Sequence, residues 1–209
     1  MTSRLISFEG IDGSGKSTQI NLLSDWFTEK NIAFEIVREP GGTSISERIR
    51  DILLDKKNLS LSDESESFLF LSARAQLASE VIMPALESEK FVICDRFIDS
   101  TLAYQGYGRG MDLSQLEAMN KMAIGECVPG LTFLLDVDIE DSIQRRSENE
   151  DDRMESAGID FLNKVREGYI LLSSQFSNRI ILLDSTEAKS SIFNKIMAQL
   201  CRVYGELNV

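Results

Sequence analysis

The stretch "FEGIDGSGKSTQ", residues 8–19, decides the fold of this 209-residue chain. Its Gly10, Gly15, Lys16 and Ser17 occupy the fixed positions of the pattern G-x-x-x-x-G-K-[ST]. Glycines let a backbone wrap closely around a phosphate group, because they adopt conformations that side chains disfavour. A short apolar run precedes the stretch and a helical apolar pattern follows it, so the sequence predicts a phosphate-binding loop between a strand and a helix.

Each part of this loop has a predicted task. Backbone N–H groups from Asp12 to Ser17 should face the phosphates, and the following helix adds its positive N-terminal end. Lys16 should reach the β and γ oxygens, and Ser17 should place its hydroxyl on Mg²⁺. The predicted nucleotide-binding residues are Gly10, Ile11, Asp12, Gly13, Ser14, Gly15, Lys16, Ser17 and Thr18.

Five short apolar runs between longer amphipathic segments predict the rest of the fold. They lack strict alternation of apolar and polar residues, which is typical of strands buried on both faces of a parallel sheet. We therefore expect an α/β fold of the three-layer P-loop NTPase kind, with a five-stranded parallel sheet flanked by helices in one domain over residues 1–209. The runs are "RLISFEG" (4–10), "AFEIVRE" (33–39), "FVICDR" (91–96), "LTFLLDVD" (131–138) and "RIILLDS" (179–185).

Local patterns add three predictions about the connections. Apolar residues at positions 45, 49, 52 and 53 repeat at helical spacing and predict a helix with an apolar face. Ser114 and Glu117 have the spacing of a capping box ahead of another helix. The polar segment from Lys57 to Ser67 is predicted to be an irregular connection.

Charge and composition exclude several classes of protein. The chain has 22 Lys and Arg against 34 Asp and Glu, a net charge of −12, which opposes general attraction to nucleic acid or to an anionic membrane surface. Any anionic ligand must therefore be held by a local cluster of basic groups. The sequence has no histidine, so a Ser-His-Asp triad and a His-ligated zinc site are excluded.

The N-terminal sequence and the cysteines predict the cellular compartment. The first residues, "MTSRLISFEG", contain no long apolar segment or cleavage site, and no apolar stretch is long enough to span a bilayer. Cys94, Cys127 and Cys201 are widely spaced in apolar surroundings, which favours buried free thiols. We expect a cytoplasmic protein that does not bind a membrane.

The acceptor side of the site is predicted from segments that follow other strands. Asp95 ends the third strand, where a carboxylate can act on Mg²⁺ directly or through water, although a helix cap or an ion pair with Arg96 would also explain it. In "FLFLSARAQ", Phe70 and Arg74 are four residues apart and share a helix face. Together with residues 38–43 and 95–110, they should gather at the carboxyl edge of the sheet, where ligands bind.

At this point the sequence closely resembles the thymidylate kinases, which pass the γ-phosphoryl group of ATP to dTMP. The resemblance runs from Arg4 to about Asp184, and the glycine loop by itself is common to many P-loop proteins. The ordered set of motifs is specific: "FEGIDGSGKST", "REPGGT", "FLFLSARAQ", "DRFIDSTLAYQG", "VPGLTFLLDVD", and "DDRMES" ahead of "FLNKVREGY".

The resemblance implies a role for individual positions. Phe70 resembles the ring that stacks on thymine, and Arg74 the donor to its O4 edge. Arg96 resembles the residue that grips the 5′-phosphate of dTMP, with Asp95 beside it near Mg²⁺. The remaining implied contacts are Asp12 to the sugar side of the acceptor, Tyr104 and Gln105 to the deoxyribose and base, Ser100 to the substrate, and Arg38 and Arg50 to the acceptor phosphate.

The reaction implied by the family needs cations rather than a general base. The acceptor phosphate is already ionised near neutral pH, so catalysis depends on positioning and on neutralising charge. The residues implied to be catalytic are Lys16, Asp12, Arg96 and Arg153.

A mobile lid over residues 145–158 should close the site and exclude water. Because Gly13 stands where eukaryotic relatives carry an arginine, the transferred phosphoryl group should be clamped from the lid, as in the bacterial type. Arg153 is the first candidate and Arg146 the second. Arg145 is the third arginine of the lid.

Two other functions stay open at this stage. A deoxynucleoside kinase would need a carboxylate base after the second strand, where Glu39 stands. A P-loop ATPase or switch would need a water-positioning residue and a partner surface instead of a second small-molecule pocket. The resemblance favours the first function, with ATP and dTMP as substrates, Mg²⁺ as cofactor and a homodimer as the assembly.

Overall fold

The fold of the chain is centred on one parallel sheet, as the sequence predicts. The computed structural model describes residues 2–146 and 152–207. The sheet has five strands in the order β2-β3-β1-β4-β5, and every strand pair is parallel. The strands are β1 (Leu5–Glu9), β2 (Phe34–Arg38), β3 (Phe91–Asp95), β4 (Leu131–Asp136) and β5 (Ile180–Asp184). All five predicted strands are therefore confirmed.

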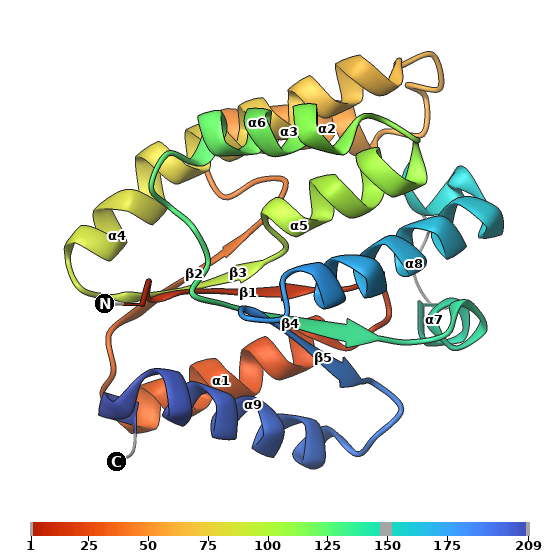
Figure 1. Cartoon of the computed structure of the whole chain (residues 1–209). Coiled ribbons are helices and arrows are strands. Elements are labelled where there is room, and N and C mark those ends of the chain that lie inside the picture. Colours follow the sequence, from red (N-terminus) through yellow and green to blue (C-terminus); the bar gives the residue numbers. More distant parts are fainter. Residues whose placement is uncertain (1, 147–151, 208–209) are drawn as a thin grey trace.

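One face of the sheet is covered by the helices α1 (Lys16–Glu29) and α9 (Lys189–Val203), which lie below the sheet in Figure 1. Ile6 and Phe8 of β1 are fully buried in this layer, together with Leu23 and Phe27 of α1. The Phe27 and Phe91 rings pack with their centroids 5.1 Å apart. This apolar layer anchors α1, and therefore fixes the glycine loop that leads into it.

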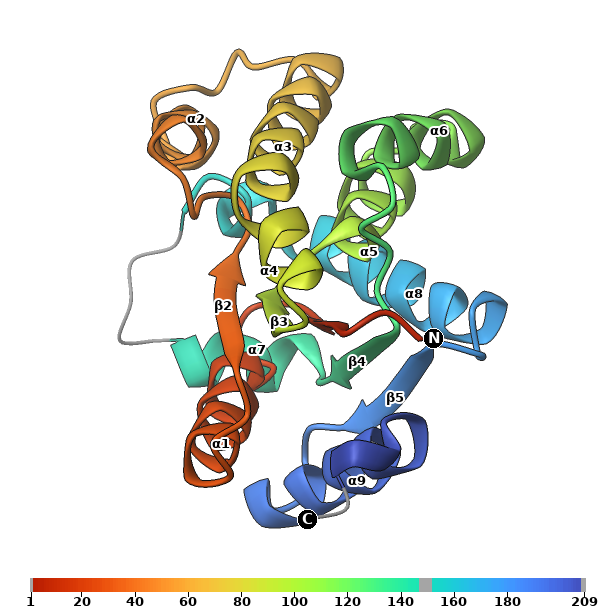
Figure 2. The same cartoon turned by 90° about the vertical axis from the view of Figure 1, so that its left-hand side faces the viewer.

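Helices from the middle of the chain cover the opposite face, as Figures 1 and 2 show. Leu5, which alternates with Ile6 along β1, points into this layer and packs with Leu77 and Ile82. The elements outside the first layer are α2 (Ser44–Leu54), α3 (Asp63–Leu77), η1 (Ala78–Ile82), α4 (Met83–Glu87), α5 (Ile98–Thr101), η2 (Leu102–Gly108), α6 (Leu113–Ile124), α7 (Ile139–Arg146), η3 (Glu155–Ala157) and α8 (Ile159–Gln175). The short η4 (Gly205–Leu207) follows α9 in the first layer, where Leu207 is buried.

The segment η2 is a π-helical stretch that packs closely against α8. Gly168 of α8 makes this approach possible, since a Cβ atom there would lie 2.6 Å from Cβ of Tyr107. The T-shaped contact between Tyr104 and Tyr169, with ring centroids 6.2 Å apart, joins the same two elements. The packing fixes η2 at the carboxyl edge of the sheet, where the loops after β1 and β3 also emerge.

Two local predictions are wrong. Helix α6 begins at Leu113, and its N-cap is Asp112, whose side chain accepts a hydrogen bond from Gln115 N, so Ser114 and Glu117 form no capping box. Helix α3 begins at Asp63 behind the N-cap Ser62, inside the segment predicted to be irregular. Helical capping by a short polar side chain decides both boundaries.

The predicted helix over residues 45–53 is confirmed as α2. Ile45 and Ile52 on its apolar face are 50% and 46% exposed, whereas Leu53 is fully buried. Because α2 lies at the outside of the helical layer and packs mainly on α3, only a narrow stripe of its surface meets other elements.

Candidate active site

The glycine loop between β1 and α1 has the backbone shape that its sequence predicts. Gly10, Gly13 and Gly15 all have positive φ angles of 131°, 77° and 93°, which disfavour other residues. At Gly13 a Cβ atom would also lie 2.6 Å from the carbonyl oxygen of Ser142 on α7. A side chain such as arginine therefore does not fit at this position, so a clamping arginine would have to come from another segment.

Lys16 folds back over this loop. Its Nζ donates to the carbonyl oxygens of Gly10 and Ile11 at 3.0 and 3.1 Å and lies 3.7 Å from Oδ1 of Asp12. Gly10 and Ile11 therefore position the lysine but do not line the cleft. Of the loop N–H groups predicted to face a phosphate, that of Ser14 donates to Ile11 O at 3.2 Å instead.

A cleft of about 750 Å³ opens at the carboxyl edge of the sheet and collects most of the predicted site residues. The glycine loop forms one end of it, and residues of α3, η2 and the loop after β3 form the other. The predicted residues that line it are Asp12, Gly13, Ser14, Gly15, Lys16, Ser17, Thr18, Arg38, Arg50, Phe70, Arg74, Asp95, Arg96, Ser100, Tyr104 and Gln105.

Arg96, Asp12 and Lys16 meet at the middle of the cleft. Arg96 Nη2 donates to Asp12 Oδ1 at 2.8 Å, the same carboxylate oxygen that Lys16 approaches. Burial opposes ionisation of Asp12, but the positive charges of Arg96 and Lys16 outweigh it and hold the pKa of this carboxyl below its usual value. Two cations therefore flank one carboxylate where the donor loop faces the acceptor side.

The backbone after β3 aims Arg96 into the cleft. Its φ angle is 68°, a left-handed conformation that is rare for a residue with a side chain, and its N–H donates to Phe8 O at 2.9 Å. Its guanidinium stacks over the Tyr104 ring at 5.2 Å and donates to Tyr169 OH at 3.3 Å. Arg96 is thus held from the side while its charge stays on the cleft.

Glu9, at the end of β1, forms the floor below these groups. Its fully buried carboxyl accepts hydrogen bonds from Phe97 N and Ser100 Oγ at 2.7 Å and from Tyr169 OH at 2.8 Å. Burial and the nearby Asp99 charge raise the pKa of Glu9 to about 7, and the hydrogen bonds offset this only in part. Glu9 thereby positions Ser100 beside Arg96 and exchanges a proton near neutral pH.

Arg74 is the most enclosed cation of the site, with 1% of its surface exposed. Its Nε and Nη2 donate to the carboxylate of Glu39, and the second Nη2 hydrogen goes to Phe97 O at 2.9 Å. Nη1 donates to Thr101 Oγ1 and to Asn120 Oδ1, both at 2.6 Å. A guanidinium has five N–H donors, and each of the five donors of Arg74 already has a protein acceptor.

The Arg74 network changes two expectations. The proposed donation from Arg74 to thymine O4 would require one of these five bonds to be shared or exchanged, so this role stays a prediction. Glu39, the candidate base of a deoxynucleoside kinase, is 7% exposed and occupied by Arg74. Burial raises the pKa of Glu39, against the opposing charge of Arg74.

Arg38 and Arg50 converge on one backbone oxygen at the rim of the cleft. Nη1 of each donates to Pro40 O at 2.8 Å. Arg38 is further held by Glu47, at 2.9 Å from Nη2 to Oε2. Burial and the neighbouring Arg38 charge lower the pKa of Arg50. The pair concentrates positive charge beside the acceptor end.

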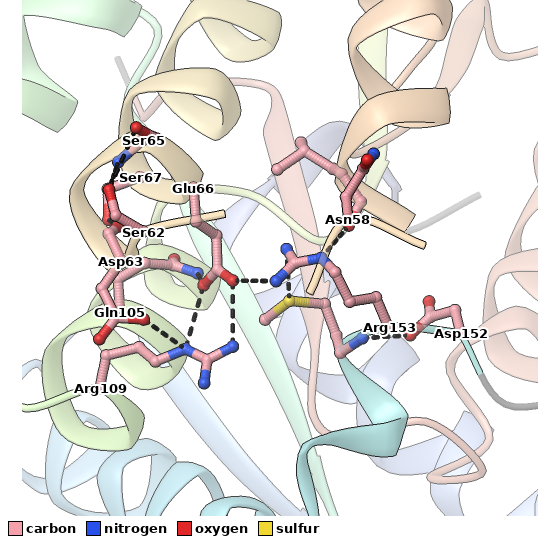
Figure 3. Close-up of polar contacts among 12 residues, drawn as sticks. Asn58, Ser62, Asp63, Ser65, Glu66, Ser67, Gln105, Arg109, Asp152 and Arg153 are labelled. Atoms are coloured by element: carbon pink, nitrogen blue, oxygen red, sulfur yellow. Dashed lines mark hydrogen bonds and ion pairs between the residues drawn. The ribbon is translucent and has the colours of Figure 1, made fainter. Parts of the chain in front are cut away.

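Figure 3 shows the buried carboxylate of Glu66 on α3 between two arginines. Arg153 Nη1 donates to Oε2 at 2.7 Å, and Arg109 Nη2 donates to the same oxygen at 3.0 Å. Gln105 Nε2 donates to Oε1 at 2.9 Å. Arg153 Nε also donates to Leu53 O at 2.6 Å, so this arginine joins the C-terminal part of the predicted lid to α2 and α3.

The three arginines assigned to the lid occupy different surroundings. Arg153 is 8% exposed and does not line the cleft, and Arg146 pairs with Glu155 at 3.0 Å. Arg145 does line the cleft, and its Nη1 donates to Gly13 O and Ser185 Oγ at 3.3 and 3.0 Å. Residues 147–151 of the predicted lid lie outside the described residues, and the roles of Arg153 and Arg146 stay predictions.

Several cleft residues were missed by the sequence analysis. Ser185, Thr186, Glu187 and Lys189 follow β5 and line the donor end, where Ser185 Oγ donates to Ser14 O. The rule that ligands bind at the carboxyl ends of parallel strands, applied to β5, would have found them. Thr101 carried no comparable signal, because its role depends on where the end of α5 meets Arg74.

The residues predicted to hold a metal lie on the same cleft. Ser17 and Asp95 both line it beside the loop lysine, and within residues 2–146 and 152–207 no hydrogen bond engages either side-chain oxygen. No group of three or more acidic or cysteine side chains that could enclose a metal occurs in those residues either. One hydroxyl and one carboxylate fit Mg²⁺, which is usually held by few protein ligands together with substrate phosphates and water.

Buried free thiols, and no membrane-spanning stretch, were also predicted from sequence. Cys94 and Cys127 are free and buried, and Cys201 is free and partly buried. Among the described helices, none is long and apolar enough to cross a bilayer.

Comparisons with known proteins give a consistent result. A family model described as thymidylate kinase matches residues 8–196. The thymidylate kinase of Chlorobaculum tepidum is 45% identical over 206 residues, covering 94% of this chain and 96% of the relative. That of Thermoanaerobacter sp. (strain X514) is 42% identical, covering 94% and 97%. The crystal structure of thymidylate kinase from Ehrlichia chaffeensis superimposes with a TM-score of 0.76 at 35% identity, covering 94% and 97%.

Proposed function

Since the chain belongs to the thymidylate kinase family and transfers the γ-phosphoryl group of ATP to dTMP, we propose that the cleft holds the two substrates end to end, with the reacting phosphates between Lys16 and Arg96. The observation that carries this assignment is the meeting of Lys16 and Arg96 on one oxygen of Asp12. Two cations at that point neutralise the charge of two phosphate groups that must approach each other.

The donor half of the cleft is proposed to be the glycine loop and the N-terminus of α1. Helix N-termini offer unpaired N–H groups, and Lys16 to Thr18 form the first turn of α1. Lys16 can exchange its two carbonyl partners for phosphate oxygens, because both belong to the loop that wraps the phosphates. Beyond the loop, Arg145 and the residues after β5 are proposed to surround the rest of the ATP molecule.

Mg²⁺ is proposed as the cofactor, held by Ser17 and Asp95 together with the phosphates. Bound there, the ion would neutralise negative charge on the donor phosphates. Both side chains are available to it within the described residues.

In the acceptor half, Arg96 is proposed to grip the 5′-phosphate of dTMP, with Ser100 beside it. Arg38 and Arg50 contribute charge at the rim. Phe70 is proposed to stack on the base, while Tyr104 crowds the deoxyribose and favours a 2′-hydrogen over a hydroxyl. The acceptor phosphate is already ionised, so no group of the chain has to remove a proton from it.

The clamp on the transferred phosphoryl group is proposed to come from the lid, approximately residues 145–158. Arg153 and Arg146 were the candidates from sequence, but Arg145 is the lid arginine that lines the cleft. Arg145 is therefore proposed to contact the donor nucleotide in the conformation described above. A role for Arg153 in the reaction would first require it to leave Glu66 and Leu53 O.

Assembly and location complete the proposal. A single kinase domain over residues 1–209 is proposed to form a homodimer through α2, α3 and α6. Ile52, Phe68 and Met122 are 46%, 55% and 83% exposed on these neighbouring helices, and exposed apolar groups of this kind favour association. A cytoplasmic location agrees with the free cysteines, because thiols stay reduced there.

A panel of acceptors with MgATP tests the function. The expected result is ADP formation with dTMP, none with thymidine, and little ATP hydrolysis without an acceptor, because the site is arranged for a phosphate acceptor and excludes water. Phosphorylation of thymidine alone would indicate a deoxynucleoside kinase. ATP turnover that is indifferent to dTMP would indicate an ATPase or switch.

A further inference from the structure

Gln105 lies at the acceptor end of the cleft with only part of its amide available. It is 2% exposed, lines the cleft, and donates from Nε2 to Glu66 Oε1 at 2.9 Å. Within the described residues, no hydrogen bond engages its carbonyl oxygen Oε1. Because a glutamine amide carries its acceptor and its donors on opposite sides, fixing the nitrogen also fixes where the oxygen points.

Glu66 can only accept hydrogen bonds. Its carboxylate is fully buried and receives N–H bonds from Gln105 Nε2, Arg109 Nε, Arg109 Nη2 and Arg153 Nη1. Burial would raise the pKa of Glu66, but these hydrogen bonds and the Arg109 charge lower it below its usual value, so the group stays ionised. An ionised carboxylate offers no hydrogen to Gln105 Oε1, so the reversed amide would place two acceptors face to face.

We propose that Glu66 is a specificity-positioning residue, which holds the Gln105 amide so that Oε1 faces the acceptor base and favours a base with an N–H donor at that edge. Thymine and uracil carry N3–H on their pairing edge, whereas cytosine presents an unprotonated N3 there. An acceptor oxygen from Gln105 therefore attracts the first two bases and repels the third. This inference rests on the proposed placement of the base beside Gln105.

Glu66 lies outside the cleft, so its effect is indirect. The two arginines compensate the burial of its charge, and Arg109 is itself fixed by Asp63 at 3.3 Å and by the Phe161 ring at 4.4 Å. The network is shared by α3, η2 and the C-terminal part of the predicted lid (Figure 3). Because both arginines are held in place by other groups, the carboxylate cannot turn away from Gln105 without giving up charged hydrogen bonds to Arg109 and Arg153.

Two variants of Glu66 separate its chemistry from its packing. Glu66→Gln keeps the shape of the side chain but adds an N–H group that can donate to Gln105 Oε1. The Gln105 amide is then free to turn and present its nitrogen to the base. Glu66→Asp keeps an acceptor-only carboxylate with a shorter reach. The measurement is kcat/KM for dTMP, dUMP and dCMP with saturating MgATP.

In Glu66→Gln the ratio of dTMP to dCMP use should fall about tenfold, in line with one misplaced hydrogen bond. The ratio of dTMP to dUMP should not change, since both bases carry N3–H. Glu66→Asp should keep the wild-type dTMP to dCMP ratio within about threefold. Equal loss of this ratio in both variants, or an unchanged ratio in Glu66→Gln, would overturn the proposal. Asp63→Asn is the matched control, because it weakens the exposed partner of Arg109 and leaves Glu66 intact.

The variant Gln105→Leu distinguishes this inference from the underlying placement of the base. If Gln105→Leu leaves the dTMP to dCMP ratio unchanged, the base does not lie beside Gln105 and the placement fails. If Gln105→Leu lowers the ratio and Glu66→Gln does not, the placement holds and the role of Glu66 fails. In the double variant, Glu66→Gln should add no further change to the ratio.

A measurement on the wild-type chain does not depend on the stability of a Glu66 variant. In this arrangement one side-chain amide proton of Gln105 donates to the buried Glu66 carboxylate. It should therefore exchange slowly with water both with and without dTMP, and its NMR signal is assigned by comparison with Gln105→Leu. Fast exchange in the free protein that becomes slow on dTMP binding would show that the amide nitrogen faces the base, against the proposal.

Discussion

The phosphate end and the base end of the cleft use their cations differently. At the phosphate end, Lys16 and Arg96 share the partly exposed Asp12 and retain N–H groups for a ligand. At the base end, Arg74 has all five donors bound by protein. The difference teaches that cations on one cleft wall can differ in how many N–H groups their protein partners leave for a ligand.

Lys16→Ala tests the phosphate end and should have the largest effect. Turnover should fall by about 10³ to 10⁵-fold, the range seen when a cation that meets developing phosphoryl charge is lost. The free energy of unfolding should change little, because removing the lysine also removes the cost of burying its charge. Steady-state ADP formation and urea unfolding measure the two quantities. A turnover within tenfold of wild type would contradict the assignment.

Arg74→Met tests the base end, where stability rather than turnover should respond. The substitution leaves the Glu39 carboxylate buried without a partner, which costs about 3–5 kcal/mol of unfolding free energy. Adding Glu39→Gln should recover part of this loss, because the second change removes the unpaired charge. Urea unfolding of the single and double variants gives the coupling between the two residues.

Arg96→Met is the matched comparison for Arg74→Met. Its partner Asp12 is 41% exposed at the side chain, so water can solvate the carboxylate when the arginine is lost. This variant should lose kcat/KM for dTMP by about 10²-fold or more while its unfolding free energy changes by less than about 1 kcal/mol. Equal losses of stability in Arg74→Met and Arg96→Met would remove the distinction between the two ends.

Glu9, on the floor between the two ends, should make stability depend on pH. Its pKa of about 7 lies above the unfolded value of 4.5, so the folded chain keeps a proton that the unfolded chain releases. The resulting stabilisation is fully present below pH 4.5 and is lost as the pH rises through 7. It amounts to about 3 kcal/mol, because each unit of pKa difference between the folded and unfolded states corresponds to about 1.36 kcal/mol.

The variant Glu9→Gln isolates this contribution from that of other groups. Glutamine does not titrate. Between acidic and slightly alkaline pH, the wild type should therefore lose about 3 kcal/mol of unfolding free energy relative to the variant. Urea unfolding across this pH range measures it. Parallel pH profiles of the two proteins would mean that Glu9 titrates alike in the folded and unfolded states.

Arg145→Met should give the smallest effect. Its contacts to Gly13 O and Ser185 place it at the donor end, on a side chain that is partly open to solvent. The KM for ATP should rise about tenfold with the KM for dTMP unchanged, as expected for one charged contact to the donor. A larger effect on the KM for dTMP than on the KM for ATP would place Arg145 at the acceptor end of the cleft instead.

Sequence reasoning located the glycine loop, of which residues 12–18 line the cleft. Residues 10–18 are consecutive, and the pattern of glycines, lysine and serine is a direct record of backbone shape and charge. The strand ends were equally predictable for Asp95 and Arg96, because apolar runs mark where each strand stops. The same rule was not applied to β5, which left Ser185 and Lys189 out.

The base end was predicted only as a set of residues. The resemblance assigned Phe70, Arg74 and Gln105, and all three line the cleft. It did not reveal that Asn120 on α6 binds Arg74, or that Glu66 binds Gln105. Asn120 is 46 residues from Arg74, and Glu66 is 39 residues from Gln105. Both lie on helices whose polar residues, seen in the sequence alone, resemble those of a solvent-exposed face.

What the sequence alone determined was the kind of fold, the position of the phosphate loop and the family, because periodic burial and a consecutive motif are local properties of a chain. Only the tertiary structure decided which of the cleft arginines are free to act, that Arg153 is held by Glu66 while Arg145 reaches the glycine loop, and which way Gln105 can present its amide. Those outcomes depend on how many acceptors surround each donor, and packing brings these acceptors from distant helices.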